Sequence, residues 1–437
     1  MSVPYHDRPY HELSEESLML LATGGSTPPI LRELVLAQRS KQAALLGGVE
    51  RLARSTAHPE TELTTRALGR LLALRRVHPD VVEDVVSSPA VAAWSLQTVR
   101  DLHAGDAAAR PGQMAALAAA VAARTGWPCR LDVPTFHGRV VLPTVGSTAR
   151  PEREQLARFT VQSGRAVIDV GEQRIVIPRE PVDDGSGWQA IRPISLNGTT
   201  FLFDDLHPTR MPGEELTDRV CAEAMRDWRT AMSDAWGLLT AHHPLRADEV
   251  RALIGTLTPL RSPPSATRSA SSRETFGCVA MSFSTDARTN ALALTHEVQH
   301  VKLGAILDVT RLAGPDRGRR YYAPWRDDPR PVEGLLQGSY AFMGVSDFWR
   351  RQRALDGGDA DRAHFEFARW RQAAESAAAT LLDSGELNPA GRIFVSVMLK
   401  TLEGWAAEPV PAGPAAAARR AAARHRRAWH ARNAEFA

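Results

Sequence analysis

The sequence is poor in cysteine and has no long apolar run. Its three cysteines, Cys129, Cys221 and Cys278, are far apart and form no Cys-x-x-Cys pair, which argues against a disulfide framework and against a zinc site made of thiolates. No apolar run approaches the ~20 residues that a membrane-spanning helix needs. Residues 1–20 are polar and acidic and contain no signal-peptide core. We therefore expect a cytoplasmic protein that does not contact a membrane.

Lysine is also scarce, so the positive charge is almost entirely arginine. Only Lys41, Lys302 and Lys400 are lysines among the 53 basic residues, and 50 acidic residues leave a net charge of +3. This balance gives no reason to expect nucleic acid as a partner. The hydrophobic share of 43% and the charged share of 24% are ordinary for a folded protein.

The pattern of apolar residues divides the chain into three regions. With 437 residues, the chain is long enough for two or three packed units. Residues 1–128 show helical spacing, with Ser88 and Pro89 placed to begin one helix and Gly47 and Gly48 expected to loosen the end of another.

Residues 129–212 contain short β-branched and aromatic runs separated by Gly, Asp and Pro, which predict an antiparallel sheet over about 129–205. Residues 213–437 return to helical spacing, from about Glu214 onward. The predicted fold class is α+β and predominantly α-helical, with a small antiparallel β-rich insert.

The segment "THEVQH" contains the pattern His-Glu-x-x-His. In a helix, His296 and His300 are four residues apart, so both imidazoles project from one face and can bind one divalent metal. Glu297 lies about 100° further round the helix, where it can reach a metal-bound water or orient a ligand. The apolar strand "CVAMSFS" precedes this helix. Together they predict a zincin-like strand–helix metal core, in which the strand could pair with a peptide along its edge.

A third metal ligand is expected from the helix predicted over "RPVEGLLQGSYAF". The extension H-x-x-G-x-x-H does not follow His300, so a carboxylate from a following helix is the natural source. Glu333 is the preferred candidate and Gln337, through its amide oxygen, is the second; Asp308 stays open as well.

The same helix supplies a further prediction about catalysis. Tyr340 follows Glu333 and Gln337 at helical spacing, and we predict that Tyr340 and Glu297 are catalytic. Gly334 and Gly338 should let this helix approach its neighbour closely.

A loop rich in arginine and aromatics, "RGRRYYAPWRDDPRP", lies between the two helices. The planar guanidinium fork suits a carboxylate, so Arg326, Arg330 and Tyr322 are predicted to bind a carboxylate-bearing co-substrate. Equally open is a loop held by arginine–aspartate pairs, because Asp327 and Asp328 are adjacent.

Several stretches resemble a family of HExxH-motif proteins that act on ribosomally synthesised peptides, the 2-oxoglutarate-HExxH peptide β-hydroxylases. They are "LATGGSTPPILRELVLAQRSKQAALL", "VVLPTVG", "LTHEVQHVKLGAILD" and "RRYYAPWRDDPRPVEGLLQGSYAFMGVSDFWR". The resemblance implies iron(II), 2-oxoglutarate and dioxygen, with His296 and His300 as metal ligands and Glu297 as a motif residue.

The resemblance further implies β-hydroxylation of a side chain in a precursor peptide, with a radical-SAM maturase as a partner. Two alternatives remain. One is a zinc-dependent gluzincin-like metallopeptidase, and the other is a non-catalytic peptide-binding maturation partner.

Overall fold

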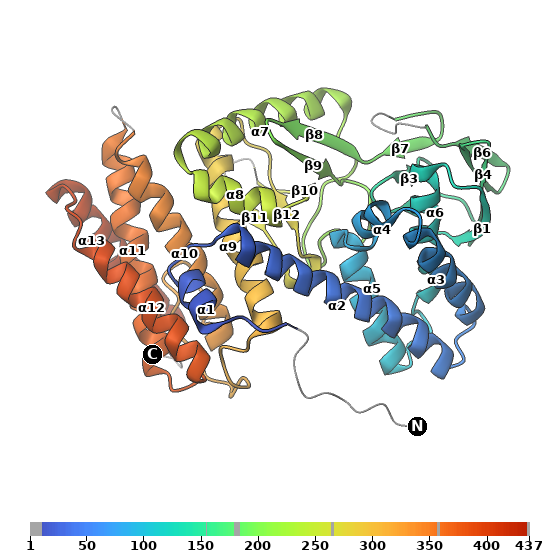
Figure 1. The fold of residues 1–437 in the computed structure, drawn as a ribbon. Coiled ribbons are helices and arrows are strands. Elements are labelled where there is room, and N and C mark those ends of the chain that lie inside the picture. The colour runs from blue at the N-terminus through green and yellow to red at the C-terminus, as the bar shows by residue number, and fades with distance from the viewer. Residues whose placement is uncertain (1–10, 154, 179–183, 264–265, 356–358, 435–437) are drawn as a thin grey trace. The chain divides into compact units, whose positions relative to one another are not determined.

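The computed structural model describes residues 11–153, 155–178, 184–263, 266–355 and 359–434. Over these ranges the protein is a mixed α+β structure, mainly helical, with three small sheets (Figure 1). This confirms the predicted α+β class and its helical bias.

The chain forms two compact units that interleave along the sequence. The first comprises the described part of Met1–Ala37 together with Ser233–Leu253 and Asp286–Ala437, and the second comprises Gln38–Met232 and Ile254–Thr285. The sequence regions 1–128, 129–212 and 213–437 therefore do not coincide with the units, because the chain enters each unit more than once.

The second unit combines helices with all of the strands. Its helical elements are most of α2 (Pro28–Ser55), α3 (Thr61–Arg75), α4 (Pro79–Val86), α5 (Pro89–Ala104), the 3-10 turn η1 (Pro111–Gln113), α6 (Met114–Thr125), the start of α7 (Ala222–His242) and η2 (Arg273–Thr275). Its strands are β1 (Cys129–Pro134), β2 (Val141–Leu142), β3 (Gly146–Thr148), β4 (Leu156–Gln162), β5 (Arg165–Val170), β6 (Gln173–Val176), β7 (Trp188–Ala190), β8 (Arg192–Leu196), β9 (Thr199–Phe203), β10 (Thr256–Pro259), β11 (Ser269–Ala270) and β12 (Cys278–Met281).

The strands between residues 129 and 203 pair antiparallel, as the sequence predicts. They form the sheet β1-β4-β5-β6, the sheet β2-β3-β7 and the β8–β9 pair of a third sheet. That third sheet, ordered β11-β12-β10-β9-β8, gains β10 and β12 from later in the chain, and β9, β10 and β12 pair in parallel. Among the described strands, parallel pairing is therefore confined to β9 with β10 and β10 with β12.

The strand that precedes the His-Glu-x-x-His helix is interior to its sheet. Ala280 and Met281 of β12 pair with β11 on one side, and the whole of β12 pairs with β10 on the other. The expectation that a peptide pairs along the edge of this strand is therefore wrong where β11 already occupies that edge.

Two helix boundaries differ from the sequence expectations. The helix α2 continues through Gly47 and Gly48 to Ser55, because interior glycine lowers helix propensity by only about 1 kcal/mol. The helix α7 begins at Ala222 rather than near Glu214. The preceding residues make other backbone bonds: the amide of Thr217 donates to the Pro259 carbonyl, and the amide of Val220 donates to the Asp205 carboxylate.

The first unit is helical throughout its described elements. They are α1 (Glu15–Ala22), the start of α2, the second half of α7, α8 (Pro244–Leu253), α9 (Ala287–Val309), α10 (Val332–Gln352), α11 (Ala360–Asp383), α12 (Pro389–Ala406) and α13 (Ala412–Arg432). The helix α10 packs between α9 and α11, α11 also contacts α12 and α13, and α8 packs on α9. Among the described residues, no helix is both long and apolar enough to cross a bilayer.

A cluster of buried charges lies behind α9, and we call Arg246, Glu249 and Lys302 the charge cluster. The Lys302 ammonium donates to a Glu249 oxygen at 2.5 Å and to the Gly24 carbonyl at 3.0 Å. Arg246 also pairs with Glu249 and donates to the Gly24 carbonyl at 2.9 Å. The Ser26 hydroxyl donates to Glu249 at 2.7 Å. The cluster thus joins α8, α9 and the segment between α1 and α2.

Burial controls the protonation of these groups. Burial lowers the pKa of Lys302 to about 8, so the ammonium is still mostly charged at neutral pH. For Glu249, burial alone would raise the pKa, but the charges of Arg246 and Lys302 outweigh burial and hold the pKa below its ordinary value. Glu249 therefore neutralises Lys302 and shares the neutralisation of Arg246 with Asp347, whose carboxylate lies 3.5 Å from that guanidinium.

We predict that Glu249→Gln destabilises the protein by about 3–5 kcal/mol, because it removes the carboxylate that pairs with buried Lys302 and leaves Arg246 with the longer contact to Asp347. Asp248→Asn is the matched control. Asp248 lies next to Glu249 on α8 and also pairs with an arginine three residues away, but its side chain is 62% exposed. Removing that surface pair should change stability by less than about 1 kcal/mol. Urea unfolding of both variants checks the difference, and equal effects would contradict a structural role for the cluster.

Candidate metal centre

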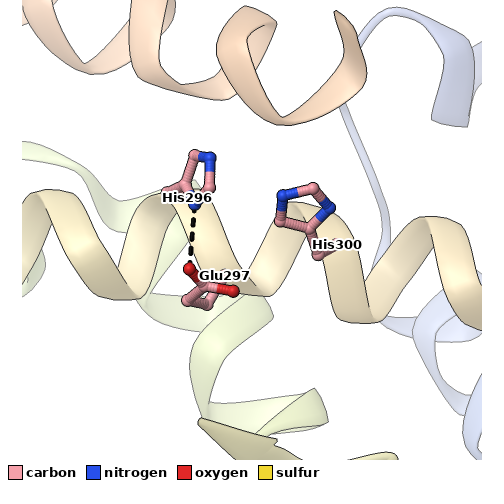
Figure 2. A group of neighbouring side chains, drawn as sticks. All are labelled: His296, Glu297 and His300. Atoms are coloured by element: carbon pink, nitrogen blue, oxygen red, sulfur yellow. Dashed lines mark hydrogen bonds and ion pairs between the residues drawn. The ribbon is translucent and has the colours of Figure 1, made fainter. Parts of the chain in front are cut away.

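The helix α9 presents its two histidines side by side. Asp286 caps its first turn by accepting from the amides of Arg288 and Thr289, which fixes where the helix begins. One turn separates His296 from His300, and their rings meet edge to face with centroids 4.7 Å apart. Figure 2 shows both rings on one side of the helix, with Glu297 reaching toward His296.

These three residues form a group that could bind a metal ion. One ligand atom from each of His296, Glu297 and His300 lies within 4.8 Å of the others. Across the described part of the chain, no other set of three or more His, Cys, Asp or Glu side chains meets this criterion. The geometry expected from the motif is therefore present.

Each histidine has a side-chain oxygen at its Nδ1 atom. Oε1 of Glu297 lies 2.9 Å from Nδ1 of His296, and Oε1 of Gln337 lies 3.2 Å from Nδ1 of His300. An oxygen acceptor at Nδ1 favours the tautomer that carries its proton there, which leaves Nε2 unprotonated for a metal. Both contacts therefore prepare the same ring atom for ligation.

Electrostatics favour the neutral form of His300. Burial lowers its pKa, and the neighbouring His296 lowers it further. A neutral imidazole is the form that binds a metal. Glu297 is 1% exposed, so its carboxylate is held in place beside His296. Two imidazoles and a carboxylate are donors that suit iron(II) or zinc.

The helix α10 brings Gln337 to His300. Glu333 lies in the exposed first turn of α10 and is outside the metal-binding group, as is Asp308. Tyr340 is buried and its hydroxyl donates to the Leu21 carbonyl at 2.6 Å, while its ring faces the Lys302 ammonium. Of the residues predicted along this helix, Gln337 alone contacts a histidine of the motif in the interactions described above.

Three aromatic side chains, Trp325, Phe342 and Trp370, form an aromatic wall beside His296. Phe342 meets the His296 ring edge to face at 5.3 Å, and it lies between Trp325 at 4.8 Å and Trp370 at 4.4 Å. The three residues come from the loop before α10, from α10 and from α11. The wall gives the histidines an apolar border.

Glycines in α10 make room for this arrangement. A Cβ atom on Gly338 would lie 2.3 Å from the Trp325 ring, and one on Gly344 would lie 2.5 Å from Cγ of Gln299. At Gly338, α10 therefore closely approaches Trp325 of the loop. At Gly344, α10 closely approaches Gln299 of α9.

Two arginines of the loop, Arg326 and Arg330, pair with one aspartate, Asp328. Arg326 donates to Asp328 at 2.7 Å and Arg330 donates to it at 3.1 Å. Arg330 also lies against Gly334, 3.0 Å from the place of its absent Cβ. The hydroxyl of Tyr322 hydrogen-bonds to Nδ1 of His425 at 2.8 Å. The loop therefore contains the arginine–aspartate pairs that the sequence left open.

Sequence reasoning missed the aromatic wall and the charge cluster. The wall gathers residues from three elements, so no local pattern marks it. The charge cluster did leave a signal, because Lys302 is a lysine in an apolar helix of a chain whose cations are nearly all arginine. A buried cation requires a buried anion, although the sequence does not identify Glu249 as that anion.

No known protein-family model matches this chain, and no curated protein is detectably similar to it in sequence.

We predict that Gln337→Ala weakens binding of zinc or cobalt(II) about tenfold, because His300 loses the oxygen that orients it. Glu333→Ala, on the same helix face, should leave the affinity within about twofold, since Glu333 is outside the group of donors. Isothermal titration of both variants checks the contrast. Loss of binding in Glu333→Ala would instead identify Glu333 as the third ligand.

We predict opposite stability changes for two glycine replacements. Gly338→Ala should destabilise by about 1–3 kcal/mol, because the methyl group collides with the Trp325 ring. Gly404→Ala should stabilise by up to about 1 kcal/mol, since that position in α12 has no atom within 4 Å and gains helix propensity. Urea unfolding measures both, and near-ultraviolet circular dichroism should change only for Gly338→Ala.

Proposed function

We propose that this chain is an iron(II)- and 2-oxoglutarate-dependent hydroxylase that acts on a side chain of a ribosomally synthesised peptide. One observation carries the proposal: the Nδ1 atoms of His296 and His300 contact Glu297 and Gln337, which favours unprotonated Nε2 atoms on both rings. A metal ion bound by the two histidines of α9 would keep further coordination positions for a co-substrate.

The residues around the histidines have separate tasks in this proposal. His296 and His300 would hold iron(II), and Glu297 and Gln337 would keep their rings in the ligating tautomer. When bound, iron(II) supplies the oxidising chemistry that turns peptide C–H, 2-oxoglutarate and O2 into peptide C–OH, succinate and CO2. The aromatic wall would exclude water from the reacting side chain.

The loop arginines could bind the distal carboxylate of 2-oxoglutarate. Arg326 and Asp328 are each about half exposed, with side-chain exposures of 51% and 50%. Exposed ion pairs contribute only about 0–1 kcal/mol, so a dicarboxylate could replace Asp328 at little cost. Arg330 lies closest to α10 and to Gln337 through its contact with Gly334.

The zinc peptidase alternative has less support from the same geometry. A gluzincin-like site needs a carboxylate from the following helix, and Glu333 lies outside the group. It also needs Glu297 to act on a metal-bound water, whereas Oε1 of Glu297 contacts His296. The contact of Glu297 with His296 is the observation that favours the hydroxylase, because a third ligand is needed in either case.

The test is anaerobic titration of the iron(II)-loaded protein with 2-oxoglutarate, followed in the visible region. We expect a metal-to-ligand charge-transfer band that is absent in His296→Ala and retained in His103→Ala, a matched substitution at an exposed residue of α5. Bound metal without a band would contradict the proposal in favour of the peptidase. Failure to bind metal would contradict it in favour of a non-catalytic peptide-binding role.

A further inference from the structure

A cavity of about 440 Å³ lies in the first unit and shares Trp370 with the aromatic wall, and we call it the arginine pocket. It is bordered by α11, α13 and the loop before α10. Alanines line its floor, and Tyr322 and Trp370 form an aromatic border. Three arginines, Arg369, Arg419 and Arg426, supply its positive charge. No aspartate or glutamate lines it.

The three arginines lack a carboxylate partner. The ion pairs among the described residues, taken as nitrogen–oxygen contacts within 4.0 Å, include none made by Arg369, Arg419 or Arg426. Many other arginines of this chain do form such pairs, including Arg326 and Arg432. The pocket therefore concentrates positive charge that the protein itself does not neutralise.

Aromatic rings and a hydroxyl position two of these cations. The guanidinium of Arg369 lies 4.2 Å from the centre of the Trp370 ring, and that of Arg426 lies 5.0 Å from the centre of the Tyr322 ring. Arg426 also donates to the Ser376 hydroxyl at 3.4 Å. Stacked guanidinium groups keep their outward N–H donors available for a carboxylate.

The spacing of the arginines on α13 limits the ligand. Arg419 and Arg426 are seven residues apart, which is two helical turns on one face and about 10 Å along the axis. The two carboxylates of a small dicarboxylate are too close together to reach both arginines. A peptide in the polyproline II conformation rises about 3.1 Å per residue with three residues per turn, so two acidic side chains three residues apart lie on one face at a matching distance.

We propose that the arginine pocket binds an acidic segment of a peptide, with two carboxylates three residues apart and an apolar side chain on the alanine floor. This inference deepens the proposed function and rests on it for the identification of the peptide as the substrate. Trp370 belongs to both the pocket and the aromatic wall, so a peptide held here would run beside the candidate metal centre.

The test uses the full chain without metal and a fluorescein-labelled decapeptide that contains Glu-Leu-Ala-Glu. Fluorescence anisotropy should show binding that weakens at least tenfold when both glutamates of the peptide are replaced by glutamine. The double variant Arg419→Glu and Arg426→Glu should also weaken binding at least tenfold.

The matched control is Arg420→Glu together with Arg427→Glu. These residues are exposed, lie on the same helix with the same seven-residue spacing, and do not line the pocket. The control changes the net charge equally, so it should weaken binding less than threefold at physiological salt. Equal losses in the two double variants would overturn the proposal in favour of non-specific attraction to α13.

A second variant tests the pocket without changing charge. Ala422 lies on the pocket floor, and Ala422→Leu should fill the floor and weaken peptide binding while leaving the unfolding transition in place. Unchanged affinity would overturn the proposal, as would displacement of the peptide by succinate at micromolar concentration. Peptide binding is measured without metal, so the two proposals are tested separately. Peptide binding can fail while the charge-transfer band forms, and the band can fail to form while the peptide binds.

Discussion

The buried carboxylate of Glu249 is the constraint on which the first unit depends. It pairs with Lys302 of α9 and with Arg246 of α8, and both cations also donate to the Gly24 carbonyl. Lys302 follows His300 by two residues, which places it about 200° round the helix. The helix is therefore held by ionic contacts on one side while it presents its imidazoles on the other. Such a network fixes the rotation of the helix, because any turn would leave a buried charge unpaired.

The rotation of α9 matters because the candidate centre is shared among elements. The imidazoles come from α9, whereas the oxygen that orients His300 comes from Gln337 of α10. The wall beside His296 takes Trp325 from a loop and Trp370 from α11, joined through Phe342. Sites carried by packed helices keep their geometry better than sites carried by loops. The chemistry we propose therefore relies on the packing of three helices rather than on the motif alone.

The aromatic wall also relates the candidate centre to the arginine pocket. Trp370 contacts Phe342 on one side and Arg369 on the other. Cations without a carboxylate partner and an apolar floor are suited to recognition, whereas paired imidazoles and an apolar border are suited to reaction. If both proposals hold, one tryptophan separates the surface that selects a peptide from the site that modifies it.

By itself the sequence determined what depends on local spacing. The helical class, the antiparallel hairpins and the common face of His296 and His300 all follow from periods of 3.6 and 2 residues. Only the tertiary structure decided that Gln337 contacts His300, and that Tyr340 turns to the Leu21 carbonyl. A helical period defines which residues share a face but not the depth or rotation at which that face meets its neighbour. The depth and rotation are set by groups distant in sequence, such as the carboxylate of Glu249 that pairs with Lys302 of α9.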